Sequence, residues 1–178
     1  MMYSHAAFKA CDVALAAFDL ASKRVPGLRL IAFGAGEPVP HLPLPANSQY
    51  FRAPAQEKLH EIYGGCDAWL FASRCEGFGL PVLEAMACRT PVIATSTGAG
   101  PEVVGESDGG GVLIPMDDAP VMADAIERIV TLPLDQWRTM SDAAHAAAMK
   151  FDWDVSTAQF EAVLIRAAEK ESKRPAAA

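Results

Sequence analysis

The chain has 178 residues, of which 51% are hydrophobic and 21% are charged, and its formal net charge is −7. This length and composition indicate one globular domain, or one domain with a helical extension, large enough to bury a proper core. The negative charge argues against a broad basic face for nucleic acid or for an anionic membrane surface, so any phosphate site must be local.

The chain carries no sequence signal for membranes, export or metals. No apolar run approaches the roughly 18 residues that a membrane span needs, and the amino terminus lacks the pattern of a signal peptide. We therefore expect a cytoplasmic protein without a membrane span. The four cysteines lack Cys-x2-Cys spacing, which favours reduced core thiols over a metal site or a disulfide. We assign no metal and no cofactor.

The first third of the chain alternates helical and extended patterns. Residues 6–24 show apolar residues at spacings of three and four, which predicts one helix, and residues 28–33 read as a strand that ends in Gly34-Ala35-Gly36. The segment 37–48 holds four prolines and is predicted to be a loop. A short candidate edge strand at 50–52 and a helix at about 55–63 follow.

The centre of the chain carries the chemistry. Residues 68–73 form an apolar block typical of a strand buried on both faces of a parallel sheet. Gly77 and Gly79 then allow unusual backbone angles and close approach of a ligand, and Pro81 suits the first turn of a helix that continues to about residue 88. A strand, a glycine loop and a helix N-terminus in this order favour binding of an anion.

Two carboxylates flank this unit. Glu76 and Glu84 are eight positions apart, and if this whole span were helical the two would lie about 12 Å apart along the axis. A glycosidase pair needs roughly 5 to 9.5 Å, so we interpret them instead as two grips on an elongated ligand such as a sugar nucleotide, with loop amides on its phosphates. The alternative is that Glu76 caps a turn and Glu84 is a solvated helix residue.

The remaining segments continue the alternation. Residues 91–95 and 112–115 are predicted strands, 101–104 is a helical turn, and Asp117 and Asp118 supply an N-cap for a helix through about Val130. Two more helices follow near 135–150 and 154–170, packed by Trp137 and Trp153, before a frayed tail. This order predicts an α/β fold with a doubly wound parallel, Rossmann-like sheet.

The central motif resembles a known family. The run Glu76-Gly-Phe-Gly-Leu-Pro-Val-Leu-Glu84-Ala-Met-Ala, followed by Thr90-Pro-Val-Ile-Ala and Gly98-Ala-Gly-Pro-Glu102, is similar to the nucleotide-sugar-binding domain of retaining GT-B glycosyltransferases with the Glu-x7-Glu motif. The resemblance covers about Lys9 to Trp153. It implies a donor-binding domain over residues 1–150, half of a GT-B fold, with a C-terminal helix and tail over 151–178.

The resemblance also implies roles for individual residues. Glu76 would contact the hydroxyls of the donor sugar, and Glu84 would bind the ribose diol. The amides around Gly77, Phe78, Gly79 and Leu80 would face the sugar and the distal phosphate, and the base would lie near Arg52 and Ala53. Arg89 departs from the glycine usual before Thr-Pro-Val, which affects the helix cap.

The family pattern is incomplete at the amino terminus. Its domain opens with a strand and a loop of the form Arg-x4-Lys whose cations neutralise the departing diphosphate. Lys9 matches the lysine, Ser4 stands in place of the arginine, and the first strand is reduced to residues 1–3 or absent. A solvated helix residue is an equally supported reading of Lys9. The partner domain that carries most of the acceptor site in the family is also missing.

We therefore predict the donor-binding half of a retaining glycosyltransferase, which moves a sugar from a nucleotide diphosphate sugar to an acceptor hydroxyl and is inactive alone. Its expected partners are the sugar nucleotide and an N-terminal acceptor domain or partner chain. One alternative is a non-catalytic module that binds a sugar nucleotide or a subunit. A dinucleotide-dependent oxidoreductase is less favoured, because Gly-x-Gly-x-x-Gly does not follow the candidate strands. The sugar, the base and the acceptor are not identified by these residues.

Overall fold

The computed structural model describes residues 1–105 and 109–172, and the chain divides into two compact units, Met1–Ala148 and Met149–Ala178. The predicted fraying of the last six residues lies outside the described residues. None of the described helices is both long enough and apolar enough to cross a membrane.

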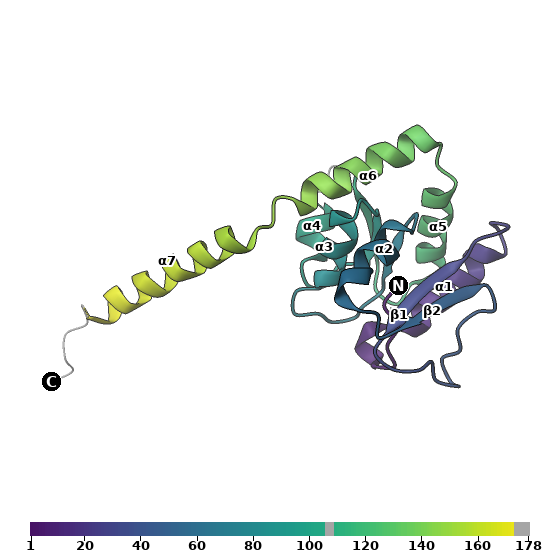
Figure 1. Cartoon of the computed structure of the whole chain (residues 1–178), viewed down its shortest axis with the longest axis horizontal. Helices are drawn as coiled ribbons and strands as arrows, with labels where there is room; N and C mark the ends of the chain where they lie inside the picture. Colours follow the sequence, from purple (N-terminus) through teal and green to yellow (C-terminus); the bar gives the residue numbers. More distant parts are fainter. Residues whose placement is uncertain (106–108, 173–178) are drawn as a thin grey trace. The chain divides into compact units, whose positions relative to one another are not determined.

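The first unit alternates strands and helices, as the sequence predicts (Figure 1). In chain order its elements are η1 (Ala7–Lys9), α1 (Cys11–Ser22), β1 (Leu30–Gly34), β2 (Ser48–Arg52), η2 (Gln56–Lys58), α2 (Leu59–Gly64), β3 (Trp69–Phe71), α3 (Leu80–Ala87), β4 (Val92–Thr95), α4 (Gly100–Gly105), β5 (Gly111–Ile114), α5 (Ala119–Val130) and α6 (Leu134–Ala148).

All described strand pairs are parallel, which confirms the predicted α/β fold class. β1 pairs with β2, from Leu30 opposite Ser48 to Gly34 opposite Arg52. A second sheet has the order β3-β4-β5. Parallel pairing requires crossovers. α3 lies between β3 and β4 and α4 between β4 and β5, whereas β1 and β2 are joined by the proline-rich segment without a helix.

A short extended segment at the amino terminus continues the first sheet. Met2 forms a parallel bridge with Phe33, the amide of Tyr3 donates to the Phe33 carbonyl at 2.6 Å, and the amide of Phe33 donates to the Met1 carbonyl at 3.2 Å. Met1 and Met2 also line a cavity of about 10 Å³ together with residues 69–73, which include β3. The predicted first strand is therefore reduced to a single bridge, at Met2.

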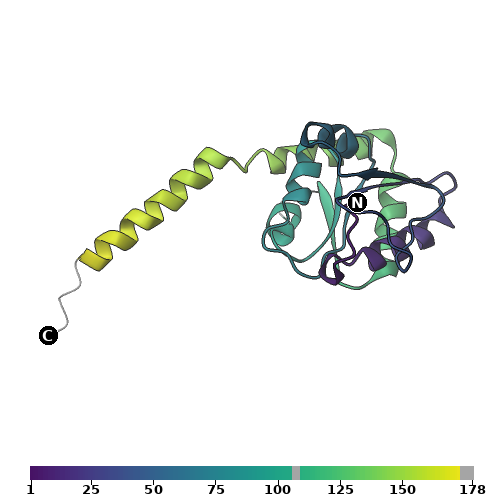
Figure 2. The ribbon, with the colours of Figure 1, turned by 60° about the horizontal axis from the view of Figure 1, so that its bottom comes forward.

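Two layers of helices bury the strands. α1 and α5 pack on each other over one face, where they meet the alternate strand residues Leu30, Ala32 and Leu70 (Figure 2). The opposite face carries an aromatic cluster in which the Phe33 and Trp69 rings stack at 5.5 Å and the Tyr63 ring meets Trp69 at 4.5 Å. Successive strand residues point to opposite faces of the sheet. Because helices cover both faces, the strands must be apolar at consecutive positions.

The predicted single helix over 6–24 is wrong. The chain forms the short 3₁₀ turn η1, then Ala10 takes a left-handed conformation with φ 48°, and α1 starts at Cys11. Phe8, which fits the apolar pattern of that helix, is 50% exposed. The cause is tertiary: the carbonyls of Ala7 and Phe8 accept hydrogen bonds from Arg74, which holds the turn away from the axis of α1.

The predicted helix at 55–63 is likewise divided, into η2 and α2. In the second unit, α7 (Trp153–Ser172) follows Asp152, whose carboxylate accepts from the amides of Asp154 and Val155. Within this unit the prediction that Trp153 packs terminal helices is not supported, because this side chain is 78% exposed. Since α7 is the single described helix of its unit, that unit offers Trp153 no second helix to pack on.

Candidate functional site

The glycine loop after β3 is built as the sequence predicts. α3 begins at Leu80, Pro81 lies in its first turn, and Gly79 precedes the helix with φ 91°. A side chain at Gly79 would bring its Cβ to 3.0 Å from the buried Phe71 ring, whereas Gly77 has open space at the same point. The glycine at 79 is therefore required by both backbone angle and packing.

The loop after β4 holds the glycine loop in place. The amide of Ala99 donates to the carbonyl of Phe78 at 2.7 Å. Gly98 has φ 55°, and a Cβ there would overlap the Phe78 carbonyl. The two loops thus touch backbone to backbone, which fixes the direction of the amides that lead into α3.

Glu76 forms a charged cluster with residues from two other segments. Its Oε1 accepts from Nζ of Lys9 at 2.7 Å and from the Ser73 hydroxyl at 2.6 Å. The Lys9 and Glu76 side chains are 18% and 10% exposed. Ser73 is buried, and its own carbonyl accepts from the Thr95 hydroxyl at 2.5 Å. The structure therefore brings the predicted residues Lys9 and Glu76 together, although 67 positions separate them.

Arg74 links the turn that carries Lys9 to two other loops. Its amide donates to Phe8 O at 2.7 Å, and its guanidinium donates to Ala7 O at 2.5 Å, to Asp12 at 3.0 Å and to Asp117 at 2.6 Å. Although burial opposes it, the charge and hydrogen bonds of Arg74 lower the pKa of the Asp12 carboxyl. We call this set of contacts, centred on Arg74 with Asp12 and Asp117, the Arg74 clasp.

Glu84, the second predicted carboxylate, is the fifth residue of α3 and is half-buried. Its Oε2 accepts from the Tyr63 hydroxyl at 2.7 Å. Burial and the neighbouring Glu84 raise the pKa of Tyr63 far above its ordinary value, so this hydroxyl stays a proton donor. The carboxylate is thereby held by a neutral donor, not by a cation.

A cavity of about 340 Å³ lies at the carboxyl ends of β1, β2 and the Met1–Tyr3 segment. Ala53 lines it, whereas Arg52 is not among its lining residues and instead pairs with Glu37 at 2.8 Å. The cavity is bounded by Met2, Tyr3, Ser4, His5, Phe33, Gly34, Ala35, Gly36, Glu37, Ala53, Pro54 and Leu59. The glycine loop also follows a strand at its carboxyl end, and ligands of open parallel sheets bind at this edge.

Sequence reasoning missed three contributors: Ser73, Arg74 and Tyr63. Ser73 and Tyr63 read as members of apolar strand and helix patterns, and no local signal distinguishes their hydroxyls. The prediction of core thiols fails at Cys75, which is exposed on the glycine loop. Among the described residues, no group of three or more His, Cys, Asp or Glu side chains could hold a metal ion.

Curated relatives share this chain's sequence over part of their length. The chain is 31% identical over 165 residues to a D-inositol 3-phosphate glycosyltransferase of Saccharomonospora viridis, covering 84% of this chain and 38% of that protein. It is 38% identical over 104 residues to the O-antigen chain mannosyltransferase B of Escherichia coli, covering 58% of this chain and 26% of that protein. The chain thus spans well under half the length of these relatives.

Solved GT-B glycosyltransferases share the fold. Sucrose-phosphate synthase from Thermosynechococcus elongatus superposes with a TM-score of 0.75 at 27% identity, covering 90% of this chain and 43% of that one. HepE from Anabaena, solved in complex with UDP-glucose, also superposes with a TM-score of 0.75, at 22% identity, covering 93% of this chain and 48% of that one.

The family model described as "Glycosyl transferases group 1" matches residues 2–131. This range contains the glycine loop, both predicted carboxylates and the cavity at the carboxyl edge of the strands. The chain therefore belongs to the group 1 glycosyltransferases.

Proposed function

We propose that the Met1–Ala148 unit binds a nucleotide diphosphate sugar and is the donor half of a retaining glycosyltransferase. The observation that carries this proposal is the cluster of Lys9, Ser73 and Glu76 beside the glycine loop. A nearly buried carboxylate paired with a cation offers a hydroxyl acceptor and a phosphate partner within one small site. HepE, which shares the fold, was solved with UDP-glucose.

Each part of the donor has a proposed partner. The base enters the cavity beside Ala53, and the ribose diol donates to Glu84 in competition with Tyr63. The diphosphate lies against the amides at Gly77–Leu80 and the start of α3, where free N–H groups and the helix dipole favour negative charge. The sugar hydroxyls donate to Glu76.

Donor binding requires an exchange of partners at Lys9. In the structure its ammonium lies 2.7 Å from Glu76. When sugar hydroxyls donate to that carboxylate, the ammonium can turn to the diphosphate, where it neutralises the charge of the leaving group. The bond from the anomeric carbon to the phosphate oxygen then breaks, and a bond from that carbon to the acceptor oxygen forms on the same face. The acceptor proton passes to the departing diphosphate oxygen, which completes the transfer, and electrostatic stabilisation of the diphosphate lowers the barrier of the reaction.

The Met1–Ala148 unit is proposed to be inactive by itself. The curated relatives are more than twice as long as the part that this chain matches. An acceptor-binding domain or partner chain would supply the rest of the site. The alternative remains a non-catalytic module that binds a sugar nucleotide or a subunit. A cytoplasmic location stays a prediction.

Calorimetric titration with UDP, GDP and ADP and their sugars tests donor binding. Glu84→Ala should weaken binding of the free nucleoside diphosphate by about tenfold or more, as expected for the loss of a hydrogen bond to a charged group. Glu76→Ala should chiefly abolish the preference for the sugar-bearing form. Glu127→Ala is a matched control, since Glu127 lies on α5 and forms an exposed ion pair with Arg24, which follows α1.

The outcomes separate the alternatives. Equal loss in both variants would refute the division of roles between the two glutamates. If no nucleotide gives heat on titration or a thermal shift, donor binding is refuted and the non-catalytic module that binds a subunit is the reading that remains. Sugar transfer or donor hydrolysis by the chain alone would contradict the proposal that it is half of an enzyme.

A further inference from the structure

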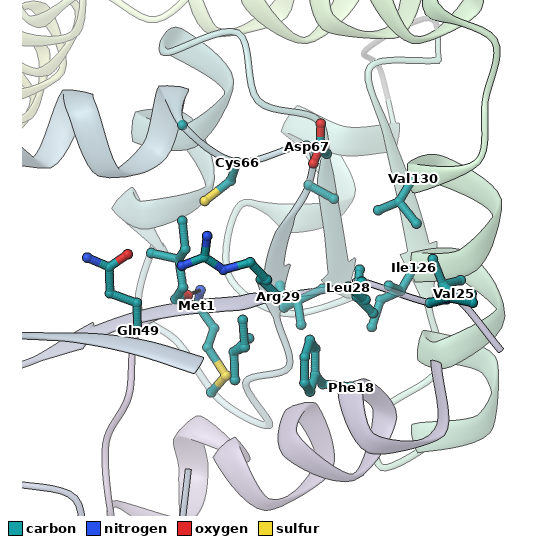
Figure 3. Close-up of a pocket in the computed structure, with 17 residues that line it drawn as sticks. Met1, Phe18, Val25, Leu28, Arg29, Gln49, Cys66, Asp67, Ile126 and Val130 are labelled. Atoms are coloured by element: carbon teal, nitrogen blue, oxygen red, sulfur yellow. Dashed lines mark hydrogen bonds between the residues drawn. The ribbon is translucent and has the colours of Figure 1, made fainter. Parts of the chain in front are cut away.

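α2 connects the candidate donor site with the other end of the strands. Leu59, its first residue, lines the candidate donor cavity. Cys66 and Asp67, just after its end, line a larger cavity of about 400 Å³ where the chain leads into β1 and β3 (Figure 3). Neither Glu76 nor Glu84 lines this larger cavity. The part of α2 that bears on donor binding is therefore the face on which Leu59 lies.

Tyr63 lies on that same face of α2, four residues after Leu59. Tyr63 is 1% exposed, and its ring meets that of Trp69 at 4.5 Å and that of Phe33 at 5.7 Å. The one polar atom of this ring, the hydroxyl, donates to Oε2 of Glu84 at 2.7 Å. Because close packing holds the ring, the direction of this hydrogen bond is fixed.

Thr90 anchors the backbone of Tyr63. Thr90 is itself 1% exposed, and its hydroxyl donates to the Tyr63 carbonyl at 2.7 Å. Its amide donates at 3.0 Å to the carbonyl of Ala85, the residue of α3 that follows Glu84. One buried residue thus ties Tyr63 to the segment that carries Glu84, so the hydroxyl and the carboxylate are placed relative to each other before a ligand binds.

The other carboxylate oxygen of Glu84 is left to accept from a ligand. Among the residues that the structure describes, none donates a hydrogen bond to Oε1. An ionised carboxylate has about four lone-pair sites, so a diol that competes with Tyr63 for this group need not displace it. The last side-chain bond of a glutamate has a broad rotational preference of its own, and a fixed donor on one oxygen therefore sets the direction of the other.

We propose that Tyr63 is a positioning residue for ribose recognition, which fixes the carboxylate plane of Glu84 so that Oε1 accepts from the diol of a ribonucleotide. This inference rests on the proposed function, in which Glu84 binds the ribose. Tyr63 acts through Glu84 and sets how strongly the chain prefers a nucleotide with an intact diol to one without it. When the phenolic hydroxyl is removed, the carboxylate turns more freely, and the entropy lost on ordering it then opposes binding.

Calorimetric titration of Tyr63→Phe tests this role. The probes are UDP, GDP and ADP and the 2′,3′-dideoxy form of each, which lacks both ribose hydroxyls. The measured quantity is the ratio of the dissociation constants of the dideoxy form and the ribose form. Ser141→Ala is the matched control, because Ser141 is also buried and its hydroxyl donates at 2.6 Å to a backbone carbonyl, that of Arg89, without contacting Glu84. Thermal melts establish that both variants fold.

For the base that the parent chain binds, we expect this ratio to fall from about tenfold to about threefold in Tyr63→Phe, since the loss of a hydrogen bond to a charged group weakens the ribose contact. Binding of the dideoxy form should change by less than about twofold, and Ser141→Ala should keep the parent ratio. In a Glu84→Ala background, adding Tyr63→Phe should leave the ratio unaltered, because Tyr63 acts only through that carboxylate.

Equal weakening of both nucleotide forms by Tyr63→Phe would show a merely structural role and overturn the inference. Tighter binding of the ribose form would overturn it as well, because Tyr63 would then be a competitor of the diol. If the parent chain binds nucleotides without preferring the ribose form, the roles of Glu84 and Tyr63 both fail while donor binding stands. If the parent chain binds no nucleotide, the proposed function itself is refuted, so the two failures are distinguishable.

Discussion

Replacing Lys9 with methionine tests the charge pair at the centre of the candidate site. Methionine keeps an unbranched apolar stem but leaves the Glu76 carboxylate, 10% exposed, without its cation. Breaking a buried ion pair from one side costs about 3 to 5 kcal/mol. The Ser73 hydroxyl still donates to the same oxygen at 2.6 Å, so we expect the unfolding free energy to fall by the smaller amount of about 2 kcal/mol.

For a unit of this size that loss lowers the melting temperature by about 4 to 8 °C. The double variant Lys9→Met with Glu76→Gln removes both charges and should lie within about 1 kcal/mol of the parent chain, because no buried charge remains unpaired. Urea unfolding followed by tryptophan fluorescence gives all four free energies of the cycle. If the two single losses add to within about 0.5 kcal/mol, the pair is not coupled and the reasoning fails.

The remaining predictions concern backbone angles and one buried amine. Gly98→Ala should weaken nucleotide binding and lower the unfolding free energy by about 1 to 3 kcal/mol, since the new Cβ overlaps the Phe78 carbonyl; unchanged calorimetric titrations would contradict this. Arg89 has φ 65° and pairs with Asp142, so Arg89→Gly and Arg89→Ala both lose that pair. Because glycine adopts this backbone angle without strain, the unfolding free energy of the glycine variant in urea should exceed that of the alanine variant by about 1 kcal/mol. The pKa of the Met1 amine falls from 8.0 to about 5 on folding, so the unfolded chain binds the extra proton between these values. The unfolding free energy should therefore rise by roughly 4 kcal/mol from pH 5 to 8, and urea titrations of an acetylated amine should lack that rise.

Local patterns predicted most of the fold because each element has a local cause. Residues 68–73 are apolar without alternation and contain β3, and Asp118 was predicted as an N-cap and accepts from the amide of Val121 at 3.0 Å. The family resemblance placed a glycine where Arg89 stands, and Arg89 adopts the left-handed backbone that a glycine favours.

The failures arise from contacts between distant segments. The break at Ala10 interrupts a helical pattern that continues without a proline or glycine signal, and its cause is Arg74, more than sixty positions away. The partner of Lys9 is equally remote, and the hydroxyl of Tyr63 is hidden within an aromatic cluster that periodicity assigns only to the core. Periodicity reports which face of an element is buried, not which polar atom meets which.

The Arg74 clasp has a consequence for exchanging loops between related proteins. A guanidinium offers a planar fork of donors, and a lysine in its place would present a single charge that cannot reach the same set of acceptors. Asp12, Arg74 and Asp117 come from three separate parts of the chain, so a chimera that imports one of them from a homologue leaves its two neighbours mismatched. In loop grafting or directed evolution these three residues should therefore be exchanged as one set.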